Sequence, residues 1–269
     1  MKKTLSFILV VALLAMTCTT AFADAANPFS IFGTDDRKIV SSTSGSNYSI
    51  CKIYIEYSDD TVGYGTGFLV DSNKVVTAGH ALCYKSSKVD GQKVATRVVL
   101  YFGCSGTNNS HTAKKTVSQT CSAGNLYYPD EWENYYDMSY DYGVIKLDNP
   151  ISTPSYLFPM RKCTVLSEGD TVTITGYEHH LKNTKFTNWQ LIQGTGKITE
   201  TDGNLLYTKI DAMAGQSGSP VIYDGEVIGI YTYSAPNADK NVYLYPDNSP
   251  LNNTITGLTL SAIREIEDF

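Results

Sequence analysis

The sequence predicts a large all-β globular protein, either a barrel or a sandwich, that ends in one short helix. Many short apolar runs are separated by turn-forming residues, a pattern that favours an all-β architecture over strands that alternate with helices. Of the 269 residues, 42% are hydrophobic and 18% are charged, which is typical of a globular chain and not of a disordered or coiled-coil one. This length predicts one large unit or two packed halves.

The first 23 residues are expected to be a secretory signal peptide and not part of the fold. A basic start precedes an almost wholly apolar stretch at 5–16, and Ala21 and Ala23 are the small residues that a signal peptidase reads. An apolar run of about a dozen residues is too short to cross a membrane core, which needs ~20. We therefore expect a secreted, extracellular protein without a membrane anchor after cleavage, and residues 24–29 are a candidate short propeptide.

Strand candidates follow one another along the exported part of the chain. Residues 51–57 alternate between apolar and polar side chains with the period of a half-buried strand. The other candidates are short apolar runs at 68–70, 75–77, 97–102, 143–147, 172–176, 205–210, 220–223 and 227–231. Asp224 and Gly225, between the last two runs, are typical of a hairpin turn.

Two further segments complete the architecture. Residues 149–159 contain three prolines and are predicted to be a linker between two β-rich halves of similar size. Thr259 can cap a short amphipathic helix over 260–269 that packs on the body of the protein. Its apolar side chains recur at three-residue intervals, at Leu260, Ile263, Ile266 and Phe269.

Removal of the signal peptide would leave five cysteines, Cys51, Cys83, Cys104, Cys121 and Cys163. In an exported protein, disulfides are the expected state of such residues, and no pair has the C-x-x-C spacing of a zinc site. Cys104 and Cys121 bracket a polar loop and are the first candidates for a bridge, with Cys51 and Cys83 as a second pair. One cysteine would remain unpaired.

A segment rich in glycine and serine, GQSGSP at 215–220, lies between two strand candidates. A serine hydroxyl is a poor nucleophile unless a nearby base accepts its proton. Glycines around it allow a tight turn that exposes the hydroxyl and leaves backbone N–H groups free for a developing oxyanion. Taken alone, the segment could equally be a simple hairpin turn.

Two residues earlier in the chain could supply the rest of a catalytic triad. His80 follows an apolar strand candidate, where a sheet would hold its imidazole in place as a general base. Asp141 begins the run DYGVIKL, at the mouth of a buried strand. Each could have a purely structural role, as a buried histidine or a turn aspartate. Their combination with Ser217, in the order His, Asp, Ser, favours a triad.

These motifs resemble those of the trypsin-like serine peptidases, which have the chymotrypsin fold, and most closely the bacterial glutamyl endopeptidase branch. The resemblance is carried by TAGH at 77–80, DYGVIKL at 141–147 and GQSGSP at 215–220, and SIFGTDDR at 30–37 looks like the mature start of that branch. It extends over residues 30–269.

The resemblance implies a fold of two six-stranded antiparallel β-barrels with the triad in the cleft between them. The first barrel would comprise residues 30–150 and contain His80 and Asp141. The second would comprise residues 151–258 and contain Ser217, and the helix would follow over 259–269.

The same resemblance implies the roles of the site residues. Ser217 would attack the scissile carbonyl, His80 would move its proton, and Asp141 would orient the imidazole. The backbone N–H groups of Gly215 and Ser217 would form the oxyanion hole. No cofactor or metal is expected, the substrates would be proteins or peptides, and the protein would act as a monomer. Gln216 stands where digestive members have an Asp that pairs with a new N-terminal amine, so that activation trigger is not expected.

Specificity for the residue before the cut stays open. The glutamyl preference of the branch is associated with a His in a pattern like I-G-I-H, where this chain has Tyr231, and with a hydroxyl residue where it has Ala212. Tyr231 could still donate a hydrogen bond, and Thr232 and Tyr233 after it are expected to contact substrate. Asp211, six residues before the serine, matches in spacing the acid that selects Arg and Lys in trypsin. Glutamyl, basic and apolar preferences therefore all remain alternatives.

Other functional classes fit less well. An α/β-hydrolase esterase needs G-x-S-x-G and the order Ser, acid, His, and neither is present. A protease-like protein that only binds its partners would usually lack one of the three triad residues. The net charge of -6, without a cluster of Lys and Arg, argues against a nucleic-acid partner.

Two remaining groups of residues are not expected to bind metal. His179 and His180 are adjacent, so on a strand they would point to opposite faces. The acidic and aromatic run at 127–137 is expected to be a surface loop, not a calcium site.

Overall fold

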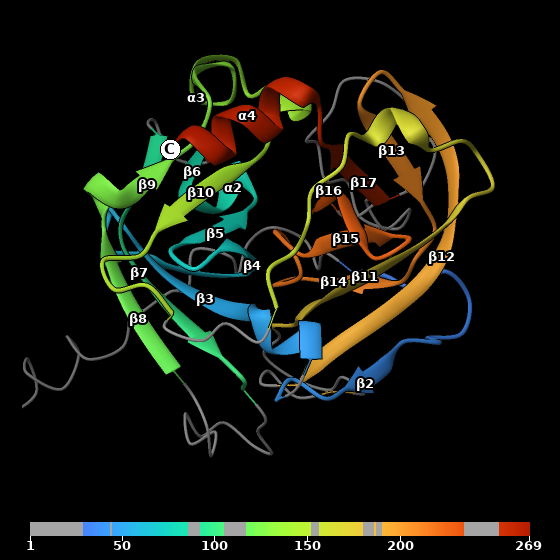
Figure 1. Cartoon of the computed structure of the whole chain (residues 1–269), viewed down its shortest axis with the longest axis horizontal. Coiled ribbons are helices and arrows are strands. Elements are labelled where there is room, and N and C mark those ends of the chain that lie inside the picture. The colour runs from blue at the N-terminus through green and yellow to red at the C-terminus, as the bar shows by residue number, and fades with distance from the viewer. Residues whose placement is uncertain are drawn as a thin grey trace, which may run out of the picture.

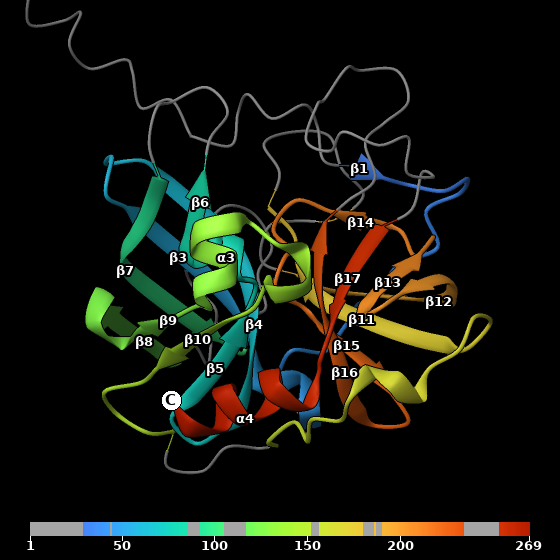
Figure 2. The same ribbon diagram turned by 90° about the horizontal axis from the view of Figure 1, so that it is seen from above.

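The computed structural model describes residues 29–43, 45–85, 92–104, 117–151, 156–179, 186, 190–233 and 253–269. Two curled β-sheets lie side by side, one built mainly from the first half of the chain and the other from the second (Figures 1 and 2). The C-terminal helix α4 (Leu260–Asp268) follows the last strand of the second sheet and returns to cover the first (Figure 2). None of the described helices has the length and apolar character needed to cross a membrane.

The first sheet contains eight antiparallel strands in the order β6-β7-β3-β4-β5-β10-β9, with β8 also paired to β7. Its interior is filled by the apolar side chains that alternate along these strands, together with Ala262, Ile263 and Ile266 of α4. The strands are β3 (Ile50–Tyr57), β4 (Val62–Asp71), β5 (Lys74–Thr77), β6 (Cys83–Lys85), β7 (Gln92–Phe102), β8 (Val117–Ser122), β9 (Leu126–Tyr127) and β10 (Gly143–Lys146).

The second sheet closes on itself as a six-stranded barrel in the order β11-β15-β16-β17-β13-β12, because β12 also pairs with β11. The strand β2 (Lys38–Val40) adds to the edge of β12. The barrel strands are β11 (Thr171–Tyr177), β12 (Leu191–Asp202), β13 (Leu205–Thr208), β15 (Pro220–Tyr223), β16 (Glu226–Tyr233) and β17 (Asn253–Gly257). A separate pair joins β1 (Phe29–Ser30) to β14 (Ala212–Met213).

The predicted all-β class and C-terminal helix are confirmed, and the second half forms the predicted six-stranded barrel. The first half differs from the predicted six-stranded barrel: its described strands form a curled sheet of eight, and no pairing among them joins the two ends of that sheet. The turn between β15 and β16 has Asp224 at φ 51° and Gly225 at φ 85°, the left-handed conformations that a two-residue hairpin loop requires. The side chain of Thr259 caps α4 by accepting a hydrogen bond from the Ala262 N–H at 3.1 Å. In its described part, the proposed linker at 149–159 contains no helix or strand.

The run at 127–137 differs from the expected surface loop. It begins with Tyr127, the last residue of β9, and contains a short helix, α3 (Asp130–Tyr135), which buries Trp132. Three acidic residues in the first helical turn favour the helix, because they lie near the positive end of its dipole.

The structure contradicts both predicted disulfides, because all five cysteines are free, buried thiols. Cys51 pairs with Phe102 of β7 and Cys83 pairs with Val94 of the same strand, so eight residues, or roughly 25 Å, separate the two positions. A disulfide needs Cα atoms within about 7 Å. Cys121 pairs with Val98 in the middle of β7, whereas Cys104 lies beyond the end of that strand. The predicted signal peptide and residues 24–28 lie outside the described residues.

Candidate active site

His80 and Asp141 are 61 residues apart in sequence and meet because their strands are paired. The antiparallel register of β5 and β10 places Thr77 opposite Gly143, so the residues just after β5 face those just before β10. His80 lies in α2 (Gly79–Leu82), a single helical turn after β5. Asp141 follows the 3-10 turn η3 (Met138–Tyr140).

Both carboxylate oxygens of Asp141 bind His80. One oxygen lies 2.7 Å from the ring Nδ1, and the other accepts a hydrogen bond of 2.7 Å from the His80 backbone N–H. Asp141 is fully buried and His80 is 9% exposed. A carboxylate held at two points orients the imidazole and favours the tautomer with its proton on Nδ1, which leaves Nε2 as an acceptor.

The surroundings of Asp141 come from both halves of the molecule. Asn204 donates to the carbonyl of Ser139 at 2.8 Å, and Thr256 donates to the carbonyl of Met138 at 2.8 Å. Both donors belong to the second half, so the second barrel hydrogen-bonds to the turn η3. Asp141 follows this turn and binds His80 of the first half.

Ser217 lies in the turn between β14 and β15 and is partly exposed. Gly215 and Gly218 on either side both have φ 89°, a conformation that favours glycine. A Cβ atom at Gly218 would overlap the carbonyl oxygen of Thr66 and the hydroxyl of Thr77, so the turn is pressed against β4 and β5 of the first sheet. The serine is thus held on the sheet that leads to His80.

Ser217 and His80 are linked through β16 and not by a direct hydrogen bond. The Ser217 hydroxyl donates to the carbonyl oxygen of Thr232 at 3.1 Å. The next residue, Tyr233, stacks on the His80 ring with the ring centroids 5.1 Å apart. The structure therefore brings His80 and Asp141 into direct contact and holds Ser217 beside them.

The turn around Ser217 leaves two backbone donors available. Among the contacts of the described chain, neither the Gly215 N–H nor the Ser217 N–H makes a hydrogen bond. The intervening Gln216 N–H is occupied, since it donates to the Met213 carbonyl at 3.1 Å, and the Gly218 N–H donates to Tyr231 at 2.8 Å. Two free N–H groups flanking one occupied group can bind an oxyanion.

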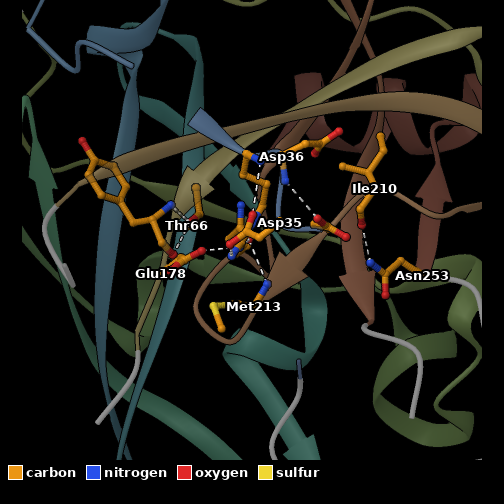
Figure 3. A network of polar contacts seen from close by, with 11 residues as sticks. Asp35, Asp36, Thr66, Glu178, Ile210, Met213 and Asn253 are labelled. Atoms are coloured by element: carbon orange, nitrogen blue, oxygen red, sulfur yellow. Dashed lines mark hydrogen bonds and ion pairs between the residues drawn. The ribbon is translucent and has the colours of Figure 1, made fainter. Parts of the chain in front are cut away.

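The carboxylate of Asp211 is directed toward residues 29–37, the segment before β2, which we call the N-terminal segment. One of its carboxylate oxygens accepts a hydrogen bond from the Phe32 N–H at 2.6 Å, and the other accepts one from the Asp36 N–H at 3.4 Å (Figure 3). Asp211 is 4% exposed, and burial raises its pKa above the ordinary value despite these two bonds. Its contacts are those of an anchor for residues 32–36.

The other residues expected to contact substrate differ in exposure. Ala212 and Tyr231 are buried in the apolar core of the second barrel. Thr232 is also buried, and its hydroxyl donates to the Thr254 carbonyl at 3.2 Å. Tyr233 is half-buried against His80.

Sequence reasoning missed a buried group of charged residues behind the Ser217 turn. Arg37 forms an ion pair with Glu178, and Lys52 donates to the Glu178 carbonyl oxygen at 3.0 Å. Burial lowers the pKa of Lys52 to about 7 and raises that of Glu178 to about 7. Arg37 belongs to the SIFGTDDR segment, but no sequence pattern distinguishes a buried arginine from an exposed one. Its partner lies 141 residues away.

No metal-binding arrangement of three or more His, Cys, Asp or Glu side chains occurs in the described part of the chain. His179 is described and stacks on Tyr64 with the ring centroids 3.7 Å apart. His180 lies outside the described residues.

Comparison with known proteins gives bacterial and animal relatives. A glutamyl endopeptidase from Bacillus licheniformis is 31% identical over 192 residues, which are 71% of this chain and 54% of that protein. An extracellular metalloprotease from Bacillus subtilis is 32% identical over 197 residues, which are 72% of this chain and 58% of that protein. Trypsin-1 of Salmo salar is 25% identical over 224 residues, 75% of this chain and 82% of that one. The chain thus matches little more than half the length of the two bacterial relatives.

Solved structures agree on the fold. A Glu endopeptidase in complex with MPD has a TM-score of 0.66 at 23% identity, and the match covers 88% of this chain and 98% of that one. A scabies mite inactivated protease paralogue has a TM-score of 0.57 at 13% identity, covering 85% and 97%. The family model described as Trypsin matches residues 39–254, which is well over half of the chain. The chain therefore belongs to the trypsin family, close to its glutamyl endopeptidase branch.

Proposed function

We propose that this protein is a serine endopeptidase that cleaves peptide bonds through an acyl-enzyme intermediate. Ser217 attacks the scissile carbonyl, His80 takes the serine proton and passes it to the leaving amine, and Asp141 stabilises the imidazolium. The observation that carries this proposal is the double contact of the buried Asp141 carboxylate with His80. It supplies a general base that is already oriented before substrate binds.

The oxyanion of the tetrahedral intermediate would be bound by the N–H groups of Gly215 and Ser217. Both groups are free of hydrogen bonds to other described residues, so neither has to break a bond when charge develops. Loss of one such donor typically costs ~3 kcal/mol of transition-state stabilisation.

The Ser217 hydroxyl must turn from the Thr232 carbonyl toward His80 before it can react. Rotation about one side-chain bond changes its direction, and catalytic hydrogen bonds often form fully only when substrate is bound. The present bond to Thr232 also favours a second candidate function, a protease-like protein that binds peptides without cleaving them. The fold is compatible with both, since it is shared with an inactivated protease paralogue.

For specificity, we propose cleavage after Glu, on the basis of the Bacillus licheniformis relative. The alternative preference for Arg or Lys would need Asp211 to face the substrate, and its two carboxylate oxygens instead bind the backbone of Phe32 and Asp36. An apolar preference is the remaining alternative. The protein would act outside the cell as a monomer on protein or peptide substrates, after loss of the signal peptide at 1–23.

Digestion of a peptide library by the purified protein, with and without a serine-directed phosphonate, tests this function. We expect cleavage after Glu that the phosphonate abolishes. The Ser217→Ala variant should lose all turnover and keep the wild-type circular dichroism spectrum and thermal unfolding midpoint, because it removes only one partly exposed hydroxyl.

Ser72→Ala is the matched control, since it removes an exposed hydroxyl that bonds only its neighbour Asp71. It should cleave at the wild-type rate. Turnover by Ser217→Ala equal to the control would refute the mechanism. Absence of any cleavage by the wild-type protein would favour the binding-only function.

A further inference from the structure

The side chain of Arg37 joins the N-terminal segment to Gln216, the residue that precedes the proposed nucleophile. Figure 3 shows Asp35 and Glu178, the two carboxylates that its guanidinium binds. Its guanidinium binds both carboxylate oxygens of Asp35 at 2.9 Å, forms an ion pair with Glu178 and donates to Oε1 of Gln216 at 3.2 Å. Arg37 is 2% exposed and Gln216 is 1% exposed. Such a buried cation remains charged because two carboxylates compensate it.

Gln216 transmits this contact to the turn itself. Its Oε1 atom also accepts a hydrogen bond from the Met213 N–H at 2.9 Å, and its own N–H donates to the Met213 carbonyl at 3.1 Å. These two bonds close the loop Met213–Gln216, which contains Gly215. The side chain bound by Arg37 thus helps to close the loop that contains the Gly215 peptide.

Glu178 supports the same turn from the other side. The next residue, His179, donates its N–H to the Ala214 carbonyl at 2.7 Å. A Cβ atom at Gly215 would lie 2.5 Å from the His179 nitrogen and 2.9 Å from the Glu178 carbonyl carbon. The backbone at Glu178 and His179 therefore packs directly on Gly215, and Arg37 binds the Glu178 side chain.

The segment that bears Arg37 is fixed at several points. β1 pairs with β14 through Phe29 opposite Met213 and Ser30 opposite Ala212. Further along, Asp211 accepts hydrogen bonds from the backbone of Phe32 and Asp36. The segment that carries the Arg37 guanidinium to Gln216 is therefore itself bound to residues 211–213, which precede the Ser217 turn.

From these contacts we propose that Arg37 is a positioning residue for the oxyanion hole. It holds Gln216 and Glu178 so that the Gly215 and Ser217 N–H groups stay free and point to one place. In this chain a cation within the N-terminal segment reaches the residue before the nucleophile, without any need for a newly cut α-amino group. The inference rests on the proposed function, since it assigns a role in the same reaction.

The test compares Arg37→Met, which keeps the length and removes the charge, with Arg97→Met as the matched control. Arg97 lies on the surface of β7, and within the described part of the chain its side chain forms an ion pair with the partly exposed Glu56. The probe is a peptide p-nitroanilide ending in Glu, and the corresponding peptide aldehyde, which forms a hemiacetal oxyanion with the serine, serves as a transition-state analogue. Active sites are counted with the serine-directed phosphonate.

We expect kcat per active site to fall on the order of 100-fold in Arg37→Met, similar to the loss of one oxyanion donor, with KM within about twofold. The aldehyde inhibition constant should rise by a similar factor, because inhibitor and transition state use the same N–H groups. Arg37→Lys should recover part of the lost kcat, since an ammonium keeps the positive charge but lacks the planar set of N–H donors with which a guanidinium binds two carboxylates. Arg97→Met should behave as wild type in all three measurements.

Gln216→Met provides a second route if Arg37→Met does not fold, because it breaks the contact and leaves Arg37 paired with Asp35 and Glu178. It should show the same fall in kcat and the same rise in the aldehyde constant. An unchanged kcat and aldehyde constant in folded Arg37→Met or Gln216→Met would overturn the inference and leave the proposed function intact. A wild-type protein that the phosphonate does not modify and that cleaves no peptide would overturn both.

Discussion

Gly79 immediately precedes His80 at a point where the backbone passes very close to other groups. A Cβ atom at this position would lie 3.0 Å from Cδ1 of Trp132, 3.0 Å from the Tyr142 carbonyl oxygen and 3.1 Å from Oδ1 of Asp141. The last of these atoms is the one that binds the His80 N–H. The absence of a side chain at residue 79 is therefore part of the contact between His80 and Asp141.

We predict that Gly79→Ala lowers kcat on the order of 10- to 100-fold, because even a small displacement of a catalytic base is costly. Overpacking should also reduce the free energy of unfolding by about 1–3 kcal/mol. Steady-state kinetics and urea unfolding measure the two effects.

Gly124→Ala is the control, because an added Cβ there meets nothing within 4 Å and its φ is not positive. This variant should match the wild type in both measurements. A kcat of Gly79→Ala equal to that of the control would show that His80 and Asp141 tolerate the displacement.

The hydrogen-bond partners of Asp211 could not be predicted from the sequence. Its spacing from Ser217 is visible in the sequence and suggested a substrate-binding acid. Its partners, the backbone N–H groups of Phe32 and Asp36, lie 179 and 175 residues away and follow no local pattern. The same holds for Arg37 and Glu178, whose pairing depends on how β1, β2 and β11 are brought together. By contrast, His80, Asp141 and Ser217 each lie in a short motif, so they could be proposed as a triad from the sequence alone.

At the scale of elements, one carboxylate of α4 adds hydrogen bonds to the apolar packing of this helix on the first half. Oε2 of Glu265 accepts hydrogen bonds from the hydroxyl groups of Tyr127 at 2.8 Å and Tyr142 at 2.6 Å. Tyr142 is adjacent to Asp141, so this contact joins the helix to the segment whose carboxylate binds His80. Ser261 of the same helix donates to Oε1 at 3.0 Å.

Glu265 should make the stability of the protein depend on pH in the acid range. Burial raises its pKa, but the hydrogen bonds from Tyr142, Tyr127 and Ser261 outweigh burial and lower the pKa below its ordinary value. The folded state therefore binds the proton less readily than the unfolded state. The stabilisation is complete above the unfolded pKa of about 4.3 and is lost as the pH falls through the folded value.

We predict that Glu265→Gln reduces the free energy of unfolding by about 1–3 kcal/mol at pH 7, because two tyrosine hydroxyls lose a charged acceptor. The difference from wild type should shrink as the pH falls below about 4. Glu267→Gln, an exposed position on the same helix, is the control and should show neither effect. Urea unfolding at pH 7 and at acid pH provides the comparison, and a difference that stays constant with pH would contradict the role given to Glu265.

Elements could be predicted from the sequence where a few neighbouring residues determine them. The cap at Thr259, the apolar spacing of α4 and the Asp224-Gly225 turn are encoded within a few residues, and each was found. The helix α3 was missed because contacts with distant residues hold it in place: the Trp132 indole N–H donates to the Cys83 carbonyl, and the Gln92 side chain donates to the Glu133 carbonyl. The two predicted disulfides were wrong because they were inferred from a local signal. The polar loop between Cys104 and Cys121 suggested proximity, but the register of β7 and β8 decides which residues are neighbours.

At the scale of the whole molecule, Thr66 of β4 connects the two halves directly at the site. Its N–H donates to the Ser217 carbonyl at 2.8 Å, and its hydroxyl donates to the Gly215 carbonyl at 2.8 Å. The same hydroxyl accepts a hydrogen bond from the Tyr177 N–H at 2.9 Å. Since β4 belongs to the first sheet and the other three residues to the second half, one buried side chain couples the packing of the halves to the shape of the Ser217 turn.

We predict that Thr66→Val lowers both stability and activity, whereas Thr66→Ser stays close to wild type. Valine has nearly the same shape but leaves the Gly215 carbonyl and the Tyr177 N–H buried without this partner, which should cost about 2–4 kcal/mol of unfolding free energy. Thr173→Val, which removes a hydroxyl from an exposed pair with Thr195, is the matched control. Urea unfolding followed by tryptophan fluorescence and circular dichroism measures stability, and turnover of the Glu peptide measures activity. Because valine keeps the shape of threonine and removes only the hydroxyl, a Thr66→Val variant as stable and as active as Thr173→Val would refute a coupling of the halves through these hydrogen bonds.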